Sequence, residues 1–338
     1  MKKYLFPEGR KFYKANLHCH TTVSDGEMAP EEIKAMYVKE GYDAVAFTDH
    51  EALILHDELT DERFVALNGY EMAIKEVNGI STTTHPMMKV HHLCLIKRHP
   101  HDNVQVCFHP ENFTPGNSKS YIPFLRYVGE VAPHSFDAAY VANLVSEARK
   151  NDFLVHYNHP RWSLMGARDL LAIPFDGLEI CNTGCVYHGD YDASMYEEYL
   201  RAGGSLSAYI VGADDNHNKK GADDSFGAFT MISAEGLTYE GLTTALAEGN
   251  AYVSTGPKIL SAYVEDGALV VHTSPAAHIL LHGEGRKLYA VHGEGGYIDK
   301  TAFPIKEEKL GKYFRLEVID SKGNHAFTHA YKTADYIG

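Results

Sequence analysis

Apolar runs alternate with segments of helical periodicity over residues 1–256. Residues 30–41 begin with proline, carry early glutamates and end at a glycine, which is typical of a helix. Further helices are predicted at residues 136–151, 167–173, 194–204 and 238–255. Strands are predicted at residues 13–17, 42–50, 64–73, 153–160, 176–182 and 206–217. This alternation indicates an α/β fold whose parallel strands are joined by helical crossovers.

Three regions depart from this alternation. Residues 80–97 have the pattern of a hairpin-like pair of strands. Residues 98–136 are rich in Pro, Asn and His, which predicts an irregular excursion over the surface. After residue 256, short runs of period two alternate with turn signals, which predicts a small all-β sandwich. We therefore expect two domains, an α/β domain at 1–256 and a β-sandwich at 257–338.

The composition is that of a globular protein. Of its 338 residues, 44% are hydrophobic and 22% are charged, which is ordinary for a folded chain. No run of residues resembles a secretory signal or a membrane span, so we expect a soluble, cytoplasmic protein. The formal net charge of −14 argues against an extended nucleic-acid groove. Five scattered cysteines without a CxxC pair predict neither a disulfide framework nor a zinc ribbon.

Side chains that can bind metal ions gather at the predicted strand ends. In NLHCHTTVSDG at 16–26, a single residue separates His18 from His20, so both point the same way from an extended backbone and can bind one ion together. The strand ends together supply nine candidate ligands: His18, His20, Asp25, His50, Glu71, His91, His159, Asp215 and His217. Imidazole and carboxylate without thiolate suit zinc, manganese or iron. Since nine ligands exceed the needs of one ion, we expect two or three divalent ions.

Seven short motifs in a fixed order carry a resemblance to a known family. They are HxH at 18–20, SDG at 24–26, TDH at 48–50, GYE at 69–71, VHHLCL at 90–95, NHP at 158–160 and DNH at 215–217. Over residues 14–256 this series resembles the polymerase and histidinol phosphatase (PHP) family. The resemblance implies a distorted (β/α)7 TIM-like barrel with a trinuclear metal centre that hydrolyses phosphoesters. The tail, which closes on FRLEVIDSKGNHAF, resembles the β-domain of the carbaryl-hydrolase-like branch of that family.

The resemblance also divides the ligands among three ions. It assigns one ion to His18, His20, Glu71 and Asp215, a second to Asp25, His50 and His217, and a third to Glu71, His91 and His159. Glu71 would then bridge two ions.

Two neighbouring pairs of residues leave a choice open. Either His91 or His92 can face inward, because strand alternation alone does not decide. We favour His91, which holds the usual position of the motif and shares a face with Leu93 and Leu95. In ADDNH, the DxH spacing selects the second aspartate, and Asp214 is expected to be a cap or a supporting acceptor.

The charge of such a centre predicts a small phosphorylated substrate, such as a nucleotide. Three divalent ions carry six positive charges, Asp25, Glu71 and Asp215 cancel three, and a bridging hydroxide leaves about two. A dianionic phosphate monoester matches that remainder, whereas a neutral ester does not. The expected mechanism is attack of a metal-bridging hydroxide on phosphorus, with Asp215 counted among the catalytic residues.

Four basic side chains are candidates for direct contact with the substrate. Arg161, two residues after His159, can donate two parallel hydrogen bonds to a phosphate. His188, after the strand at 176–182, can protonate a leaving group as a general acid. Lys219 and Lys220 could bind a second anionic group, but a solvated loop is the simpler account.

Two other functions fit the same residues. A hydrolase of carboxylic or carbamic esters could use the same metal centre, and a panel of leaving groups would separate it from a phosphoesterase. A non-catalytic metal-binding scaffold is disfavoured, because no position of the ordered set carries an apolar residue. The sequence leaves the substrate, the metal and the oligomeric state open, because a fold alone does not set them.

Overall fold

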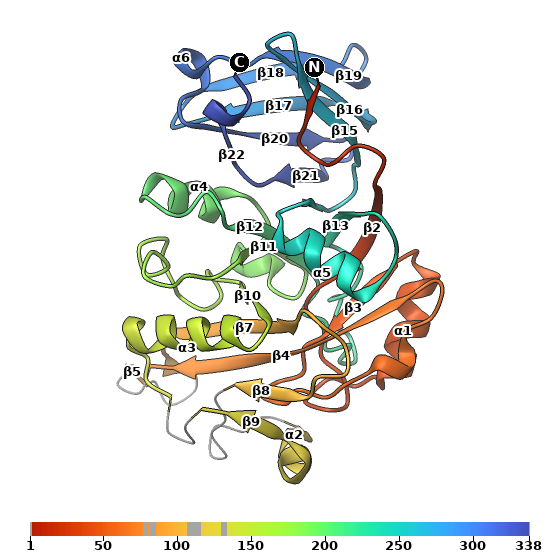
Figure 1. The fold of residues 1–338 in the computed structure, drawn as a ribbon, viewed down its shortest axis with the longest axis vertical. Coiled ribbons are helices and arrows are strands. Elements are labelled where there is room, and N and C mark those ends of the chain that lie inside the picture. The colour runs from red at the N-terminus through yellow and green to blue at the C-terminus, as the bar shows by residue number, and fades with distance from the viewer. Residues whose placement is uncertain (1, 77–79, 82–85, 107–115, 130–133, 338) are drawn as a thin grey trace.

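The computed structural model describes residues 2–76, 80–81, 86–106, 116–129 and 134–337. Two parts follow one another along the long axis of the molecule, an α/β part and a smaller β-domain that holds both chain ends (Figure 1). Its helices are α1 (Pro30–Lys39), α2 (Ser118–Tyr121), α3 (Ala138–Lys150), α4 (Ser194–Arg201), α5 (Tyr239–Ala247) and α6 (Glu307–Leu310). Among the described residues, no helix is long and apolar enough to cross a membrane.

One large sheet runs through both parts of the molecule. Its order is β12-β11-β10-β7-β4-β3-β2-β13-β14-β21-β20-β17-β18, and β22 pairs with β20. In the α/β part its strands are β2 (Lys11–Asn16), β3 (Ala44–Phe47), β4 (Val65–Lys75), β7 (Val90–Lys97), β10 (Phe153–Tyr157), β11 (Gly177–Asn182), β12 (Tyr209–Ala213), β13 (Phe229–Ala234) and β14 (Ala251–Ser254). In the β-domain they are β17 (His278–Gly283), β18 (Leu288–His292), β20 (Tyr313–Ile319), β21 (His325–Thr328) and β22 (Tyr331–Lys332).

The large sheet is mixed: the strands predicted from the α/β alternation are parallel within two groups, and antiparallel strands stand beside them. The strands β2, β3 and β4 are parallel to one another, as are β10, β11 and β12. Between these groups β7 is antiparallel to both β4 and β10, and β13 is antiparallel to β2. No described helix lies between β4 and β7, only the short antiparallel pair β5 (Ile80–Ser81) and β6 (Pro86–Met87). Without a crossover helix, the chain returns beside β4 in the opposite direction.

The large sheet curls so that its first strand, β12, lies beside β13 in the middle of the strand order. No backbone ladder among the described strands closes it into a barrel. Instead the Thr230 hydroxyl in β13 donates to the Gly212 carbonyl in β12 at 2.9 Å and accepts from the Gly212 amide at 3.0 Å. A Cβ at Gly212 would lie 2.6 Å from Cγ1 of Val253, so the missing side chain permits this close approach. The structure therefore has a curled sheet, with β12 and β13 joined by the Thr230 side chain, in place of the expected distorted barrel.

Two predicted helices differ in the structure. The residues at 167–173 form turns, although Leu170 and Ile173 are buried as in a helix that packs on a sheet. The helix predicted at 238–255 ends at Ala247, and the strand β14 follows it. Gly249 adopts a φ of 72°, which favours glycine and ends the helix. The excursion at 98–136 contains the short parallel pair β8 (Val104–Val106) and β9 (Arg126–Val128), and part of it lies outside the described residues.

The β-domain consists of two packed sheets, as predicted for the tail. The second sheet has the order β1-β15-β16-β19, with β1 (Lys3–Tyr4), β15 (Ile259–Glu265), β16 (Ala268–Ala276) and β19 (Ile298–Pro304). Leu269 and Phe303 of this sheet share a core with Ile279 and Leu316 of the large sheet. Since β1 pairs with β15 and β14 pairs with β21, chain segments from before residue 257 contribute to this end of the molecule.

Candidate metal centre

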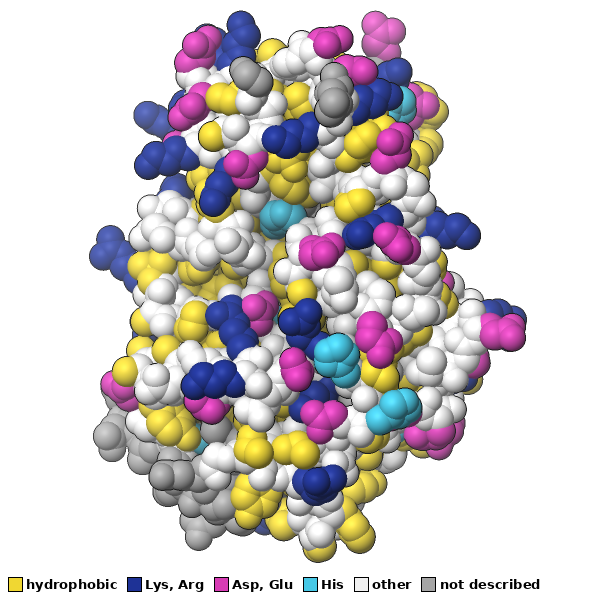
Figure 2. Space-filling view, viewed as in Figure 1, with side chains coloured by type: hydrophobic (Ala, Val, Ile, Leu, Met, Phe, Trp, Pro, Cys, Tyr) yellow, Lys and Arg dark blue, Asp and Glu magenta, His cyan; other side chains and the backbone are white. Residues whose placement is uncertain are grey.

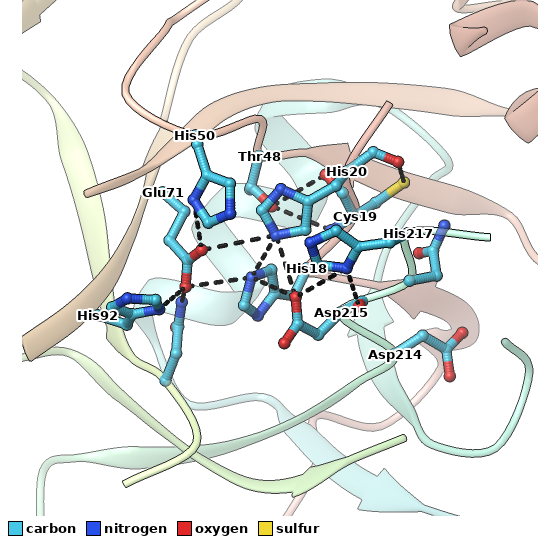
Figure 3. A network of polar contacts seen from close by, with 12 residues as sticks. His18, Cys19, His20, Thr48, His50, Glu71, His92, Asp214, Asp215 and His217 are labelled. Atoms are coloured by element: carbon cyan, nitrogen blue, oxygen red, sulfur yellow. Dashed lines mark hydrogen bonds and ion pairs between the residues drawn. The ribbon is translucent and has the colours of Figure 1, made fainter. Parts of the chain in front are cut away.

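Several of the predicted ligands point toward one another: His18, His20, His50, Glu71, Asp215 and His217 (Figure 3). His18 and His20 follow β2, His50 follows β3, and Glu71 lies within β4. On the other side of the site, His159 follows β10, while Asp215 and His217 follow β12. The expectation that strand ends converge is met for the ligands that follow β2, β3, β10 and β12, because these strands run in the same direction across the sheet. Glu71 lies inside β4 and not at its end.

The HxH pair aims both of its imidazoles at one point. Nε2 of His18 lies 3.2 Å from Nε2 of His20, and Oδ1 of Asp215 lies 3.2 Å and 3.0 Å from these two atoms. Burial, together with the neighbouring imidazoles, lowers the pKa of His20 to about 3, so its ring is neutral at pH 7. Cys19 between them faces away, as expected, and burial raises the pKa of its thiol. Two convergent ring nitrogens beside a carboxylate are the arrangement that a divalent cation needs.

A second cluster is formed by Asp25, His50 and His217, with His20 beside it. Nε2 of His217 lies 3.3 Å from Oδ1 of Asp25, and Nε2 of His50 lies 3.6 Å from the same oxygen. Burial lowers the pKa of His217, but the hydrogen bond to Asp25 and the charge of Asp215 outweigh burial and raise it to about 9. The same imidazoles hold the pKa of Asp25 below its usual value, although burial opposes this.

A third cluster is formed by Glu71, His92 and His159. Oε1 of Glu71 lies 3.0 Å from Nδ1 of His92 and 3.4 Å from Nε2 of His159, while its Oε2 lies 3.1 Å from Nδ1 of His50. Both oxygens of Glu71 also lie near the HxH pair, at 3.3 Å from His18 and 3.5 Å from His20. Glu71 is therefore shared by all three clusters, which extends the expected bridging role.

His92 takes the place that was predicted for His91. Across the antiparallel ladder, His92 pairs with Ala73 and Cys94 pairs with Glu71, so His92 shares the face of Glu71. The ring of His91 packs on Phe136 at 4.4 Å, and its Nδ1 lies 2.8 Å from the hydroxyl of Tyr157. The prediction of His91 is therefore wrong, because the face that it shares with Leu93 and Leu95 belongs to the hydrophobic core.

The buried polar atoms of the clusters fit divalent cations. Four of them make no hydrogen bond of good geometry, although three lie close to an opposite group of the clusters: Nδ1 of His20, Oδ1 of Asp25, Nδ1 of His50 and Nδ1 of His92. A buried polar atom without a partner costs about 1–3 kcal/mol, so several in one place indicate that another group completes the site. Imidazole nitrogens and carboxylate oxygens are donors for borderline divalent ions.

Glu179 is a buried carboxylate that the sequence predictions missed. Its Oε1 lies 3.2 Å from Nδ1 of His18, and its Oε2 accepts from the backbone N–H of His159 at 2.8 Å. A carboxylate on the second nitrogen of a ligating imidazole fixes the orientation of the ring. The available signal was an acidic residue inside the apolar strand GLEIC, where burial requires a partner.

Two further aspartates hold the loops that present the ligands. Asp49 accepts four hydrogen bonds, from the backbone N–H and hydroxyl of Thr21 and of Ser24, at 2.7–3.0 Å. It thereby shapes the turn before Asp25. Asp214 accepts from the hydroxyl groups of Tyr37 and Thr183, and burial raises its pKa to about 6. Asp214 is thus the supporting acceptor that was expected.

A cavity of about 620 Å³ opens above the three clusters. Besides the ligands it is lined by Trp162, Thr183, Gly184, Cys185, Tyr187, Lys219, Gly221, Ala222, Asp223 and Asp224. Lys219 reaches it from the loop after β12, with Nζ 3.2 Å from Oδ2 of Asp25. The cavity is thus polar at the base, with aromatic rings and one lysine at its mouth.

Arg161 and His188 do not line this cavity, so the structure does not bring them to the site. The guanidinium of Arg161 donates to the hydroxyl of Ser194 in α4 at 2.6 Å. The carboxylate of Asp190 accepts from the backbone N–H groups of Arg161 and Trp162 at 3.0 Å and 2.8 Å. These hydrogen bonds fix the turn that places Trp162 against the cavity. In the loop after β11, Tyr187 lines the cavity and His188 does not.

The fold and the site together define a metal-dependent hydrolase. Residues 16–209, more than half of the chain, match the model of the PHP domain, and the chain belongs to this family. No curated protein matches the chain. Membership of the chain in the PHP family confirms the resemblance predicted from the seven motifs. The likeness of the tail to the carbaryl-hydrolase-like branch stays a prediction.

Three solved structures that match the chain have low sequence identity to it and TM-scores below 0.5. A two-domain protein from Bacteroides vulgatus, containing a predicted PHP-like metal-dependent phosphoesterase, is 13% identical and covers 97% of this chain and 98% of its own, with a TM-score of 0.43. A candidate metal-dependent phosphoesterase from Bifidobacterium adolescentis is 15% identical over 65% of this chain and 91% of its own, with a TM-score of 0.39. An amidohydrolase from Chromobacterium violaceum with bound sulfate is 14% identical over 60% and 87%, with a TM-score of 0.36.

Proposed function

We propose that the protein is a phosphoesterase that hydrolyses a small phosphorylated substrate, a mono- or diester, at a centre of two or three divalent ions. The observation that carries the proposal is the position of Glu71, whose carboxylate lies within 3.5 Å of five imidazole nitrogens that fall into three clusters. One carboxylate shared in this way suits neighbouring ions a few ångströms apart. The scaffold of the site is a curled sheet whose described strands form no closed barrel.

The ligand set favours zinc, manganese or iron. It offers imidazole nitrogen and carboxylate oxygen, with His92 in place of His91 in the third cluster. When bound, the ions supply the positive charge that stabilises a phosphoryl transition state and lowers the pKa of water.

The charge balance of the site favours a phosphate over a neutral ester. Three divalent ions would exceed the charges of Asp25, Glu71 and Asp215 by three. Of the other charged residues that line the cavity, Lys219 adds one positive charge, and Asp223 and Asp224 add two negative charges. A dianionic phosphate monoester offsets this excess, and Lys219 can hold one of its outer oxygens. On the face shown in Figure 2, Lys and Arg side chains are interspersed with Asp and Glu, which suits a small substrate better than a long polyanion.

The side chains in the cavity point to water as the nucleophile. Cys185 is the thiol that lines the cavity, and burial together with the charge of Asp215 raises its pKa, so the thiol stays protonated. A protonated thiol is a poor nucleophile. Of the other lining residues, Thr183 commits its hydroxyl to Asp214, where it donates at 2.6 Å.

Metal analysis combined with three chromogenic substrates tests the proposal. Metal content per chain is measured after repletion with zinc, manganese or iron and dialysis. Hydrolysis of p-nitrophenyl phosphate, its bis-ester and p-nitrophenyl acetate is then compared before and after chelation. We expect two or three ions and chelator-sensitive release from a phosphate ester. Turnover of the acetate alone would favour a carboxylic or carbamic ester hydrolase, and retention of no ion would overturn the metal centre.

A further inference from the structure

Two aromatic side chains stand at the mouth of the cavity. Trp162 is 40% exposed, and Tyr187 is 97% exposed although it lines the cavity. Exposed aromatic rings at the rim of a polar site are candidates for contact with a ligand, because Trp and Tyr offer rigid contact area that loses little conformational freedom. The sequence predictions assigned neither residue a role.

Trp162 lies directly beside the candidate ligands. Its ring centroid is 5.2 Å from that of His92 and 5.0 Å from that of His159. One side of the indole is therefore occupied by two imidazoles of the third cluster, and its exposed part borders the cavity. The same two imidazoles contact the carboxylate of Glu71, so a planar group on the exposed part of Trp162 would lie close to the third cluster.

The backbone segments that carry the two rings belong to one connected pair of loops. Asp190, which is buried, binds the backbone N–H of Trp162 and lies in the same loop as Tyr187. That loop is fastened to the end of β12, because the N–H of Gly184 donates to the carbonyl of Asp214 at 2.8 Å. Rings positioned before a ligand arrives lose less entropy on binding. The charged lining residues Lys219, Asp223 and Asp224 come from the loop after β12 and not from the loops that carry the two rings.

We propose that Trp162 and Tyr187 form an aromatic rim that selects phosphate esters whose leaving group carries a planar ring next to the ester oxygen. The inference rests on the proposed phosphoesterase function and adds the chemical class of the leaving group. Trp162 takes the ring by stacking beside the metal centre, and Tyr187 covers it from the neighbouring loop. Lys219, whose Nζ lies 3.2 Å from Oδ2 of Asp25, would contact the phosphate oxygens from the loop after β12.

Binding of inert phosphonates to the zinc-loaded protein tests this rim. Phenylphosphonate and cyclohexylphosphonate have the same charge and similar size, and their carbon–phosphorus bonds are not hydrolysed by a phosphoesterase. Trp162 is the single tryptophan of the chain, so its fluorescence reports on ring contact without background. We expect about fivefold to tenfold tighter binding of the phenyl compound, as one aromatic pair contributes. We also expect that this compound alone quenches Trp162 strongly.

Variants separate a stacking role from a structural one. Trp162→Leu, followed by calorimetry, and Tyr187→Ser, followed by fluorescence, should each lose most of the preference, while Trp162→Phe should keep it. Tyr297→Ser, an exposed tyrosine of the β-domain, is the matched control and should bind like wild type. Metal content is measured for each variant, so that a lost ion is not mistaken for a lost ring contact.

The outcomes distinguish this proposal from the function on which it rests. Equal affinity for both phosphonates, or an unchanged preference in Trp162→Leu, would overturn the aromatic rim and leave the phosphoesterase intact. If neither phosphonate binds and no phosphate ester is hydrolysed, both proposals fail together. A preference that disappears in Trp162→Leu and returns in Trp162→Phe supports the rim.

Discussion

The neighbours His91 and His92 face opposite sides of β7 and offer a matched pair of variants. His92→Ala removes an imidazole from the third cluster, so we expect the repleted protein to lose about one ion per chain. His91→Ala removes a contact to Tyr157 outside the clusters and should keep the full number of ions. Elemental analysis after dialysis measures both. Loss of an ion from His91→Ala with retention in His92→Ala would restore the assignment made from the sequence.

Asp49 is expected to influence the metal affinity of the site although its carboxylate is not a metal ligand. Its carboxylate holds Thr21 and Ser24 through four hydrogen bonds, and Asp25 is the next residue. Asp49→Asn should therefore weaken binding of the most loosely held ion by about tenfold to a hundredfold, as is usual when support of a ligand is lost.

A competition titration with a chromogenic chelator gives the affinity of the Asp49→Asn variant. Asp61→Asn is its control, since Asp61 is an exposed aspartate whose partner is Lys34. Unchanged affinity in Asp49→Asn would mean that the turn keeps its shape without the carboxylate.

At the scale of single residues, the sequence predicted the direction of a side chain where the local backbone determines it. It failed where neighbouring strands or loops determine that direction. The shared direction of His18 and His20 follows from the alternation of one strand, and the sequence sufficed. The choice between His91 and His92 depends on the register between β7 and β4, which alternation leaves open. Arg161 was misplaced because Asp190, distant in sequence, fixes the turn around it.

Within the β-domain, Glu317 of β20 joins three strands. Its Oε2 lies 2.7 Å from Nε2 of His282 in β17, and its Oε1 lies 2.7 Å from Nδ1 of His325 in β21. Burial alone would raise its pKa, but these hydrogen bonds and the charge of Arg315 hold it well below its usual value of 4.5. A carboxylate with a lowered pKa stabilises the fold above the unfolded value and loses this contribution as the pH falls.

Glu317→Gln is therefore expected to destabilise the protein in a pH-dependent way. At pH 7 we expect a loss of about 1–3 kcal/mol in the free energy of unfolding, the usual range for a hydrogen bond to a charged group. The difference from wild type should shrink below about pH 4.5, where the unfolded glutamate takes up a proton. Urea unfolding at pH 7, 5 and 4 measures this, with the exposed Glu308→Gln as control. A difference that stays constant with pH would show that the charge of Glu317 does not contribute.

The elements themselves were predictable where local signals were strong. Proline, early glutamates and a final glycine marked α1 correctly. The helix predicted at 238–255 was too long. Gly249 forms a turn, and the β-branched and aromatic residues after it form β14. This strand exists only through its pairing with β13 and β21. The direction of β7 also depends on its partners, and no local pattern of apolar residues records it.

Across the whole molecule, the large sheet passes from the α/β part into the β-domain without a break. β14 pairs with β13 on one side and β21 on the other. Arg315 of β20 makes an ion pair with Glu197 of α4, and the hydroxyl of Tyr196 accepts from the backbone N–H of Ala330 at 3.0 Å. These contacts cross the boundary predicted near residue 257, so we expect both parts to unfold together.

Trp162 fluorescence reports unfolding of the α/β part, so it can test the effect of a substitution made in the β-domain. The single tryptophan lies in the α/β part, whereas Glu317 lies in the β-domain. In the metal-depleted protein, where no bound ion adds stability to one part alone, Glu317→Gln should lower the urea midpoint seen by Trp162 fluorescence as much as the midpoint seen by far-ultraviolet circular dichroism. If the fluorescence midpoint stays at the wild-type value while circular dichroism shows a separate, earlier transition, the β-domain unfolds alone. The boundary at residue 257 would then separate two independent folding units, and the pairing of β14 with β21 would be too weak to couple them.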